Sequence, residues 1–195
     1  MGKGIFIAAC KDFIELPPAL VEDHPTNERK LDSDSANQNL RRNFVRSFGG
    51  FFEGTMFALK GTLVKSNEFF VLPLAPAEMA LLAEESYSLN DDGEIITQPV
   101  FLKALRNLKF LLQIFPKANG FSFNPNYSDH KFGSLQKSIK VRNRLMHPKS
   151  TAEFNVADEE ITAIKEATSW LFQTFSELLK RSKEENHLAK LPRRK

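Results

Sequence analysis

The sequence predicts an all-α fold: an antiparallel bundle of four to five helices with a small β-hairpin insertion. Two long segments, 35–66 and 157–186, repeat apolar residues at steps of three and four, as amphipathic helices do. Two shorter segments, 99–115 and 129–147, carry the same period. Helices of these lengths can bury their apolar faces against one another in an up-down arrangement.

Three parts are expected along the chain, whose 195 residues are enough for one well-buried core. Residues 1–33 form an irregular N-terminal segment in this prediction, because Leu16-Pro17-Pro18 breaks any regular pattern and a polar run follows. Residues 34–186 form the helical bundle. Residues 187–195 form a flexible basic tail, whose charges are expected to be solvated.

The first long helix has an apolar face at helical spacing: Leu40, Phe44, Phe48, Phe51, Thr55, Leu59 and Thr62. Three glycines interrupt this helix, and each costs up to about 1 kcal/mol in a helix interior. They are Gly49, Gly50 and Gly54. Their clustering predicts the close approach of another backbone, either from a neighbouring helix or from a symmetry mate.

Residues 77–86 are predicted to form a short helix, and residues 87–97 a β-hairpin. The hairpin is indicated by Asn90-Asp91-Asp92-Gly93, a turn-forming run that lies between two β-prone stretches. A turn explains the two aspartates of this run better than a metal site does, because Asp and Asn side chains hydrogen-bond readily to turn backbone.

The boundaries of the later helices follow from capping residues and prolines. Helix 99–115 is expected to end before Pro116. Asp129 is expected to cap the next helix, since its side chain can accept a hydrogen bond from a free backbone N–H group. That helix should end at His147, because Pro148 disfavours helical geometry at the residue before it. The last helix begins with acidic residues, as the helix dipole favours: Asp158, Glu159 and Glu160.

The segment 141–148 combines three side chains that suit phosphodiester chemistry: Arg142, Asn143 and His147. Arginine is a permanent cation whose planar fork of donors fits a phosphate, and histidine exchanges protons near neutral pH. Asn143 and His147 are four residues apart and share a helix face, whereas Arg142 lies about 140° from His147 and must reach across. Taken alone, these residues also fit a solvated charge and a histidine that favours a helix end.

The run Arg142-Asn143-Arg144-Leu145-Met146-His147 resembles the signature of the HEPN superfamily: an arginine, a polar residue, three further residues and a histidine. In that family the polar residue is often Asn or Asp, and a long amphipathic helix follows the motif, as it does here. Beyond the motif the resemblance rests on helix order alone. It implies a metal-independent endoribonuclease of toxin–antitoxin or phage-defence systems, although other members bind nucleotides or modify proteins.

In the hypothesis that this resemblance implies, Arg142 stabilises the pentacoordinate phosphorane, and His147 is general acid or base on the 2′-hydroxyl or the leaving 5′-oxygen. Asn143 orients one of these groups or helps to shape the motif. Further basic residues are expected to bind the substrate: Lys140, Arg144 and Lys149. Glu53 is a candidate to orient Arg142 or another arginine such as Arg46; the alternative is a solvent-facing carboxylate on the far side of its helix.

The expected partners are RNA, which alone carries a 2′-hydroxyl, and a second copy of the chain. The 18 phenylalanines supply core area and can also fill a two-fold interface. HEPN domains generally dimerise so that two motifs face one cleft, and toxin-like members imply a cognate antitoxin. Two alternatives remain open: a non-catalytic module or accessory subunit that binds RNA or a nucleotide, and a structural dimer in which Arg142 and His147 only hydrogen-bond across the interface.

Composition argues against several other classes. The single Cys10 leaves no intramolecular disulfide and no cysteine cluster. The histidines are too scattered for a metal site, so neither a metal nor a cofactor is expected: His24, His130, His147 and His187. No apolar run approaches the ~20 residues that span a bilayer, so a cytoplasmic protein with no membrane partner is expected. The net charge of +3 says little about partners.

Overall fold

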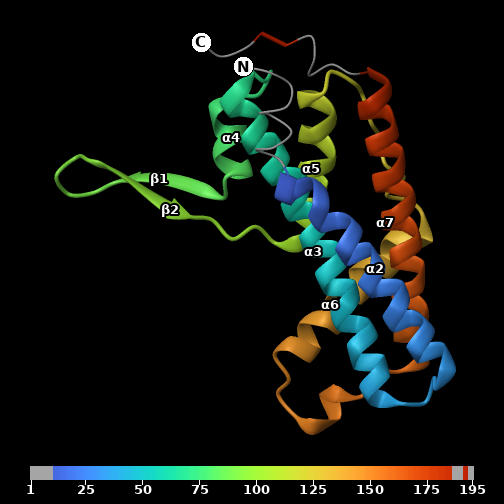
Figure 1. The fold of residues 1–195 in the computed structure, drawn as a ribbon. Coiled ribbons are helices and arrows are strands. Elements are labelled where there is room, and N and C mark those ends of the chain that lie inside the picture. Colours follow the sequence, from blue (N-terminus) through green and yellow to red (C-terminus); the bar gives the residue numbers. More distant parts are fainter. Residues whose placement is uncertain (1–10, 186–190, 193–195) are drawn as a thin grey trace. The chain divides into compact units, whose positions relative to one another are not determined.

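The computed structural model describes residues 11–185 and 191–192, with side chains from residue 22 onward (Figure 1). This part of the chain is mostly helical, with one two-stranded antiparallel hairpin, as the sequence predicts. The elements are α2 (Lys11–Ser33), α3 (Gln38–Phe69), α4 (Pro76–Leu82), β1 (Glu85–Leu89), β2 (Ile95–Pro99), α5 (Ala104–Ala118), α6 (His130–Met146), the 3₁₀ helix η1 (Thr151–Phe154) and α7 (Asp158–Glu185).

The chain divides into two compact units, which we describe separately. The motif unit comprises residues 15–55 and 124–179, and therefore contains segment 141–148. The hairpin unit comprises residues 56–123 together with the described residues of 1–14 and 180–195. In neither unit does a described helix combine the length and apolar content needed to cross a membrane.

The core of the motif unit is built on aromatic side chains from α3. Phe44, Phe48 and Phe51 of the predicted apolar face are at most 2% exposed. The Phe51 ring stacks on Phe172 of α7, with ring centroids 4.8 Å apart. Burying a phenylalanine contributes about 1.5–3 kcal/mol, so this face supplies much of what holds α3 in place.

The prediction that residues 1–33 are irregular is wrong for residues 11–33, which form α2; residues 1–10 lie outside the described part. His24 and Leu31 are seven residues apart, so they share one helix face, and both are buried at 0% and 2% exposure. Each proline of α2 removes one backbone donor. Burial of the face that carries His24 and Leu31 compensates for the lost donors. This burial cannot be inferred from the sequence periodicity of the segment.

The first long helix runs three residues later than predicted, from Gln38 to Phe69. Its start is fixed by Asn37, whose Oδ1 accepts hydrogen bonds from the backbone N–H groups of Asn39 and Leu40 at 3.0 and 3.4 Å. An asparagine in this position is a favourable N-cap because it satisfies donors that have no partner within the helix.

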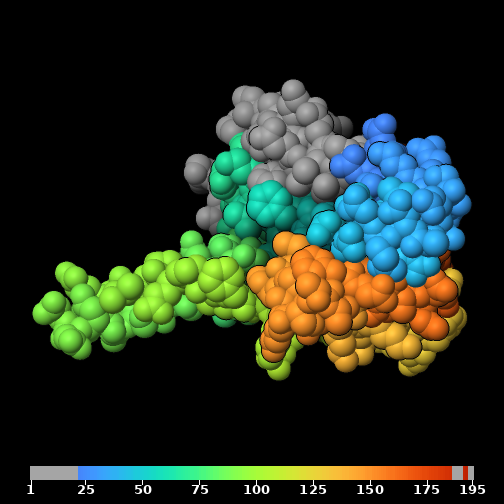
Figure 2. Space-filling view, turned by 90° about the horizontal axis from the view of Figure 1, so that it is seen from below, coloured from blue at the N-terminus to red at the C-terminus, as the bar shows by residue number. Residues whose placement is uncertain are grey.

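The hairpin unit contains the predicted hairpin, with Tyr87 opposite Thr97 and Leu89 opposite Ile95. Asn90 closes the turn, because its Oδ1 accepts from the backbone N–H groups of Asp92 and Glu94 at 3.1 and 2.7 Å. Most side chains of the hairpin, drawn in green in Figure 2, are exposed. The short helix predicted at 77–86 is α4, which already ends at Leu82. The last two residues of the predicted helix, Glu85 and Ser86, belong to β1.

Helix α5 passes through Pro116 instead of ending before it, which corrects the predicted boundary. Proline in the last turn removes only one backbone hydrogen bond there, and the buried Pro116 side chain adds to the core of the hairpin unit. The helix ends where Gly120 adopts the left-handed conformation at φ 71°. The backbone N–H of Phe121 then donates to the Pro116 carbonyl at 3.1 Å, a common way to close a helix.

The predicted basic tail is described only at residues 191–192. The carbonyl of Pro192 accepts a hydrogen bond from the backbone N–H of Val71 at 2.9 Å, so this short segment of the hairpin unit lies beside the chain that follows α3. Residues 187–190 and 193–195 lie outside the described part of the chain, and the prediction for them stays a prediction.

Candidate functional site

Helix α6 positions the Arg–Asn–His motif at its C-terminal end. As predicted, Asp129 caps the helix, and its side chain accepts from the Lys131 backbone N–H at 2.9 Å. The predicted end is also confirmed: α6 stops at Met146, and His147 leaves helical geometry with φ −134° and ψ 59°. The His147 backbone N–H still donates to the Asn143 carbonyl at 3.1 Å. The imidazole is therefore carried just beyond the last helical turn.

The Arg142 guanidinium is held on two sides. Its Nη2 donates to Glu53 Oε2 of α3 at 2.7 Å, and its Nη1 donates to Asn143 Oδ1 at 3.1 Å. The Arg142 side chain is 26% exposed and that of Glu53 47% exposed. An ion pair this accessible to water contributes at most about 1 kcal/mol to stability. Its main effect is to fix the direction of a cation that solvent, and hence a ligand, can reach.

Gly49 makes this arrangement possible. A Cβ atom at position 49 would lie 3.1 Å from Arg142 Cγ and 3.3 Å from Arg142 Nε. At Gly49 the predicted close approach is therefore made by a side chain, and not by another backbone. A Cβ at Gly50 would meet no described atom within 4 Å. One glycine thus lets the Arg142 side chain lie flat against α3, while its neighbour leaves open space.

The imidazole of His147 is exposed, and no described residue of the chain forms a hydrogen bond with it. Of the predicted site residues, the structure thus brings together Arg142, Asn143 and Glu53. It places His147 on the same end of α6, with no hydrogen-bond partner among the residues that the structure describes. An imidazole in this position is accessible to water and to a bound ligand.

The predicted substrate-binding residues differ from one another in their surroundings. Lys140 and Lys149 are exposed, which is compatible with the predicted role. Arg144 is instead used by the protein itself: it donates to both carboxylate oxygens of Glu160 at 2.8 and 2.9 Å and to the Asn155 carbonyl at 2.8 Å. A bidentate pair of this kind occupies the face of the guanidinium that would bind phosphate. Arg144 is therefore not part of the site proposed below.

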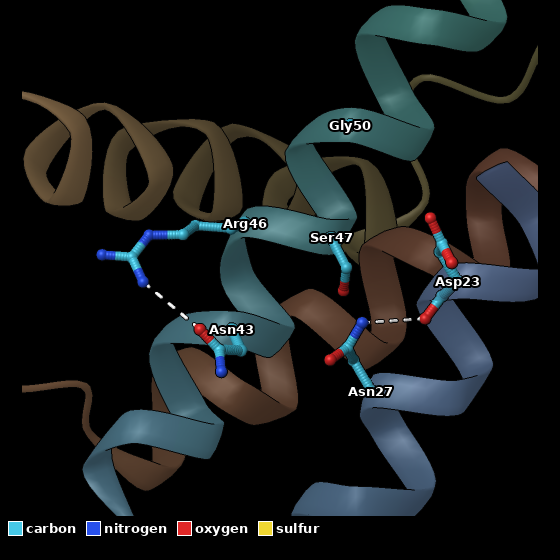
Figure 3. A pocket seen from close by; sticks show the side chains of 6 residues that line it. All are labelled: Asp23, Asn27, Asn43, Arg46, Ser47 and Gly50. Atoms are coloured by element: carbon cyan, nitrogen blue, oxygen red, sulfur yellow. Dashed lines mark hydrogen bonds between the residues drawn. The ribbon is translucent and has the colours of Figure 1, made fainter.

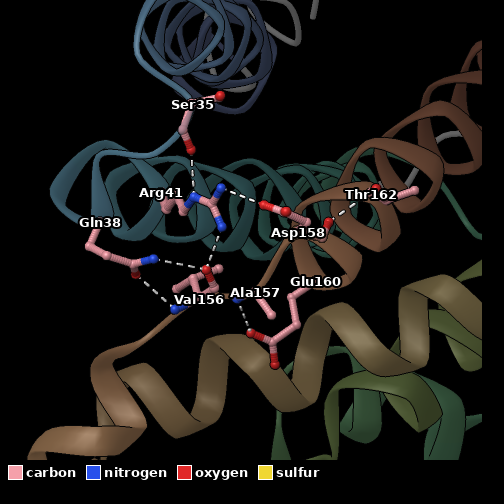
Figure 4. Close-up of polar contacts among 8 residues, drawn as sticks. All are labelled: Ser35, Gln38, Arg41, Val156, Ala157, Asp158, Glu160 and Thr162. Atoms are coloured by element: carbon pink, nitrogen blue, oxygen red, sulfur yellow. Dashed lines mark hydrogen bonds and ion pairs between the residues drawn. The ribbon is translucent and has the colours of Figure 1, made fainter.

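The chain that follows the motif is fastened to the start of α3 (Figure 4). Gln38 accepts from the Val156 backbone N–H at 2.8 Å and donates to the Val156 carbonyl at 3.1 Å. Arg41 donates to the same carbonyl at 2.8 Å and pairs with Asp158. These contacts restrain the path of residues 148–157 and hence the direction in which His147 leaves α6. Sequence reasoning missed them, because the partners are more than a hundred residues apart.

His24 of α2, a second histidine of the motif unit, has a structural role that the sequence did not reveal. Its ring has no solvent exposure and stacks on Phe44, with centroids 4.7 Å apart. Its Nδ1 lies 3.0 Å from Ser47 Oγ, and its Nε2 lies 2.9 Å from Thr168 Oγ1. Burial disfavours the charged imidazolium and lowers the pKa of His24 to about 4. The ring is therefore neutral at pH 7 and ties α2 to α3 and α7.

A polar pocket of about 390 Å³ opens between α2 and α3 in the same unit (Figure 3). Its lining residues come from both helices: Asp23, Asn27, Asn43, Arg46, Ser47 and Gly50. Across residues 11–185 and 191–192, no group of three or more His, Cys, Asp or Glu side chains is arranged to hold a metal ion.

The chain matches no protein-family model, no curated protein and no solved structure. A function for the chain is therefore inferred from the geometry of the motif unit and from the spacing of Arg142, Asn143 and His147 in the sequence.

Proposed function

We propose that the chain is a metal-independent endoribonuclease of the HEPN type, toxin-like or defensive in role. In this proposal two copies of the chain form a cleft, and each copy contributes one Arg142 and one His147. Arg142 stabilises the negative charge that develops on phosphorus, because a guanidinium presents several N–H donors to phosphate oxygens. His147 moves a proton to or from the 2′-hydroxyl or the leaving 5′-oxygen.

The single observation that carries this proposal is the way in which Arg142 is held. Glu53 and Asn143 each take one hydrogen bond from its guanidinium, and Gly49 gives its side chain room to lie against α3. A cation whose position is set before the substrate arrives does not have to reorganise during the reaction, and such preorganised charge is usually the largest single contribution to catalysis. The exposed imidazole of His147 supplies the proton-transfer group on the same helix end.

RNA is the proposed substrate because the proposed reaction uses a 2′-hydroxyl, which DNA lacks. The 2′-oxygen attacks the adjacent phosphorus as its proton leaves, and the bond from phosphorus to the 5′-oxygen breaks as that oxygen gains a proton. The products are a 2′,3′-cyclic phosphate and a free 5′-hydroxyl. The exposed cations Lys140 and Lys149 attract the RNA backbone in this proposal.

The test is cleavage of a mixed-sequence RNA by the purified full chain in EDTA. His147→Ala and Arg142→Ala should each lose most of the activity. His130→Ala is the matched control, since His130 is an exposed histidine at the opposite end of α6 and should be dispensable. Cleavage that persists in His147→Ala would show that the catalytic assignment is wrong. Salt-dependent RNA binding without any product would favour the non-catalytic RNA-binding module instead.

A further inference from the structure

The pocket between α2 and α3 has opposite charges at its two ends. Figure 3 shows Asp23 at one end and Arg46 at the other, with Asn27 and Ser47 between them. Both side chains are exposed, and among the described residues neither Asp23 nor Arg46 forms an ion pair. The pocket is open to solvent, and its volume of about 390 Å³ lies in the range of small-molecule sites.

Several polar groups of the pocket are held by hydrogen bonds. Ser47 Oγ donates to the Phe44 carbonyl at 2.9 Å and lies 3.0 Å from Nδ1 of the buried His24. Asn27 Nδ2 donates to the Asp23 carbonyl at 2.9 Å, which holds the amide in place and leaves its oxygen available. At the other end, Arg46 Nη1 donates to Asn43 Oδ1 at 3.3 Å. Ser47, Asn27 and Arg46 are thus held by hydrogen bonds before any ligand arrives, whereas the exposed Asp23 carboxylate has no described partner and is available to accept.

The pairing of a carboxylate with a guanidinium indicates which ligand fits. Guanine is the one common RNA base with two adjacent donors on its Watson–Crick edge, N1–H and N2–H, which a carboxylate can accept together. Its other edge carries two adjacent acceptors, O6 and N7, to which an arginine donates in a bidentate manner. Adenine, cytosine and uracil lack this combination. Asp23 and Arg46, at the two ends of one pocket, match the two edges of guanine.

One face of α3 carries residues of the pocket and the glutamate that binds Arg142. Arg46, Gly50 and Glu53 follow one another at steps of four and three residues, so they lie along the same side of the helix. Seven residues of α-helix rise about 10 Å, which separates Arg46 from the Glu53 that holds Arg142. Gly50 lies between them and, without a side chain, leaves the path open.

We propose that this pocket binds a guanine nucleotide, and that in an RNA substrate it selects a guanosine next to the phosphate held by Arg142. Asp23 accepts from the Watson–Crick edge of the base, and Arg46 donates to O6 and N7. The placement beside a cleaved phosphate rests on the proposed function, whereas the affinity for guanine does not.

Binding of GMP to the full chain, measured by titration calorimetry against AMP, CMP and UMP, tests the pocket. GMP should bind at least about tenfold more tightly than the other three. Asp23→Asn should remove that preference, and Arg46→Gln should weaken GMP binding. Glu22→Gln is the matched control, because Glu22 is an exposed carboxylate one residue earlier on α2 and faces about 100° away from the pocket. Equal affinity for the four nucleotides, or an Asp23→Asn variant with unchanged preference, would overturn the proposal.

RNA substrates that differ only by guanosine-to-adenosine exchange separate this proposal from the nuclease proposal. Cleavage that follows the guanosines supports both. GMP binding without any RNA cleavage would support the guanine pocket, as a site for a free nucleotide, and would contradict the nuclease proposal. Cleavage that ignores guanosine keeps the nuclease and rejects the pocket as its specificity site. Thermal unfolding of Asp23→Asn, whose carboxylate has no described protein partner, should stay unchanged and thereby exclude misfolding.

Discussion

Replacing Gly49 with alanine separates the positioning of Arg142 from the stability of the fold. The new Cβ would lie 3.1 Å from Arg142 Cγ and 3.3 Å from Arg142 Nε, so the arginine side chain must shift by a few tenths of an ångström. Its guanidinium is tethered to Glu53 at 2.7 Å and cannot follow freely. Alanine gains up to about 1 kcal/mol over glycine in a helix interior. Loss of the exposed ion pair costs at most about the same.

The free energy of unfolding of Gly49→Ala should therefore stay within about 1 kcal/mol of the wild-type value, while the rate of RNA cleavage falls. A misplacement of 1 Å can cost about a hundredfold in rate, so a shift of a few tenths of an ångström should cost less, up to about tenfold. Urea denaturation and single-turnover RNA cleavage measure the two effects. Gly133→Ala is the control, because Gly133 is exposed on α6 and a Cβ there meets no described atom within 4 Å. Wild-type cleavage by Gly49→Ala would refute the positioning argument.

Two further predictions concern the motif unit. Because the pKa of His24 is about 4 in the fold against 6.5 unfolded, the unfolded chain takes up its proton first as pH falls. The free energy of unfolding should then fall as the pH is lowered from about 6.5 to 4, by up to about 3 kcal/mol. In His24→Phe, urea unfolding measured over the same pH range should lack this decrease. Arg144→Ala should lower the free energy of unfolding by about 1–3 kcal/mol, since it breaks the pair with Glu160. The salt dependence of RNA binding should stay unchanged in this variant. A weaker salt dependence would instead show that Arg144 contacts the RNA.

Local signals were sufficient for much of the fold. The spacing of Phe44, Phe48 and Phe51 identified the buried face of α3, and Asp129 and Pro148 marked both ends of α6, because helix faces and caps depend on residues within a turn or two. Helix α2 could not be found in this way. Its prolines argue against a helix, and the burial that stabilises it involves Ser47 of α3 and Thr168 of α7.

The same difference between local signals and long-range contacts applies to the candidate site. The motif could be recognised from the sequence, because its residues are close together in the chain. Whether Glu53 faced Arg142, Arg46 or solvent could not be decided, because the answer depends on how α6 crosses α3 at Gly49. Arg144 was assigned to the substrate, since nothing in the sequence shows that Glu160 takes up its donors.

In the proposed reaction Arg142 and His147 together cleave RNA through its 2′-hydroxyl. The decisive experiment compares a short RNA with a matched substrate in which only the nucleotide before the mapped cleavage point lacks that hydroxyl. The wild-type chain in EDTA should cut the first and leave the second intact at this position, and His147→Ala should cut neither. Cleavage of the deoxy substrate at the same bond, or an unchanged rate for His147→Ala, would contradict it.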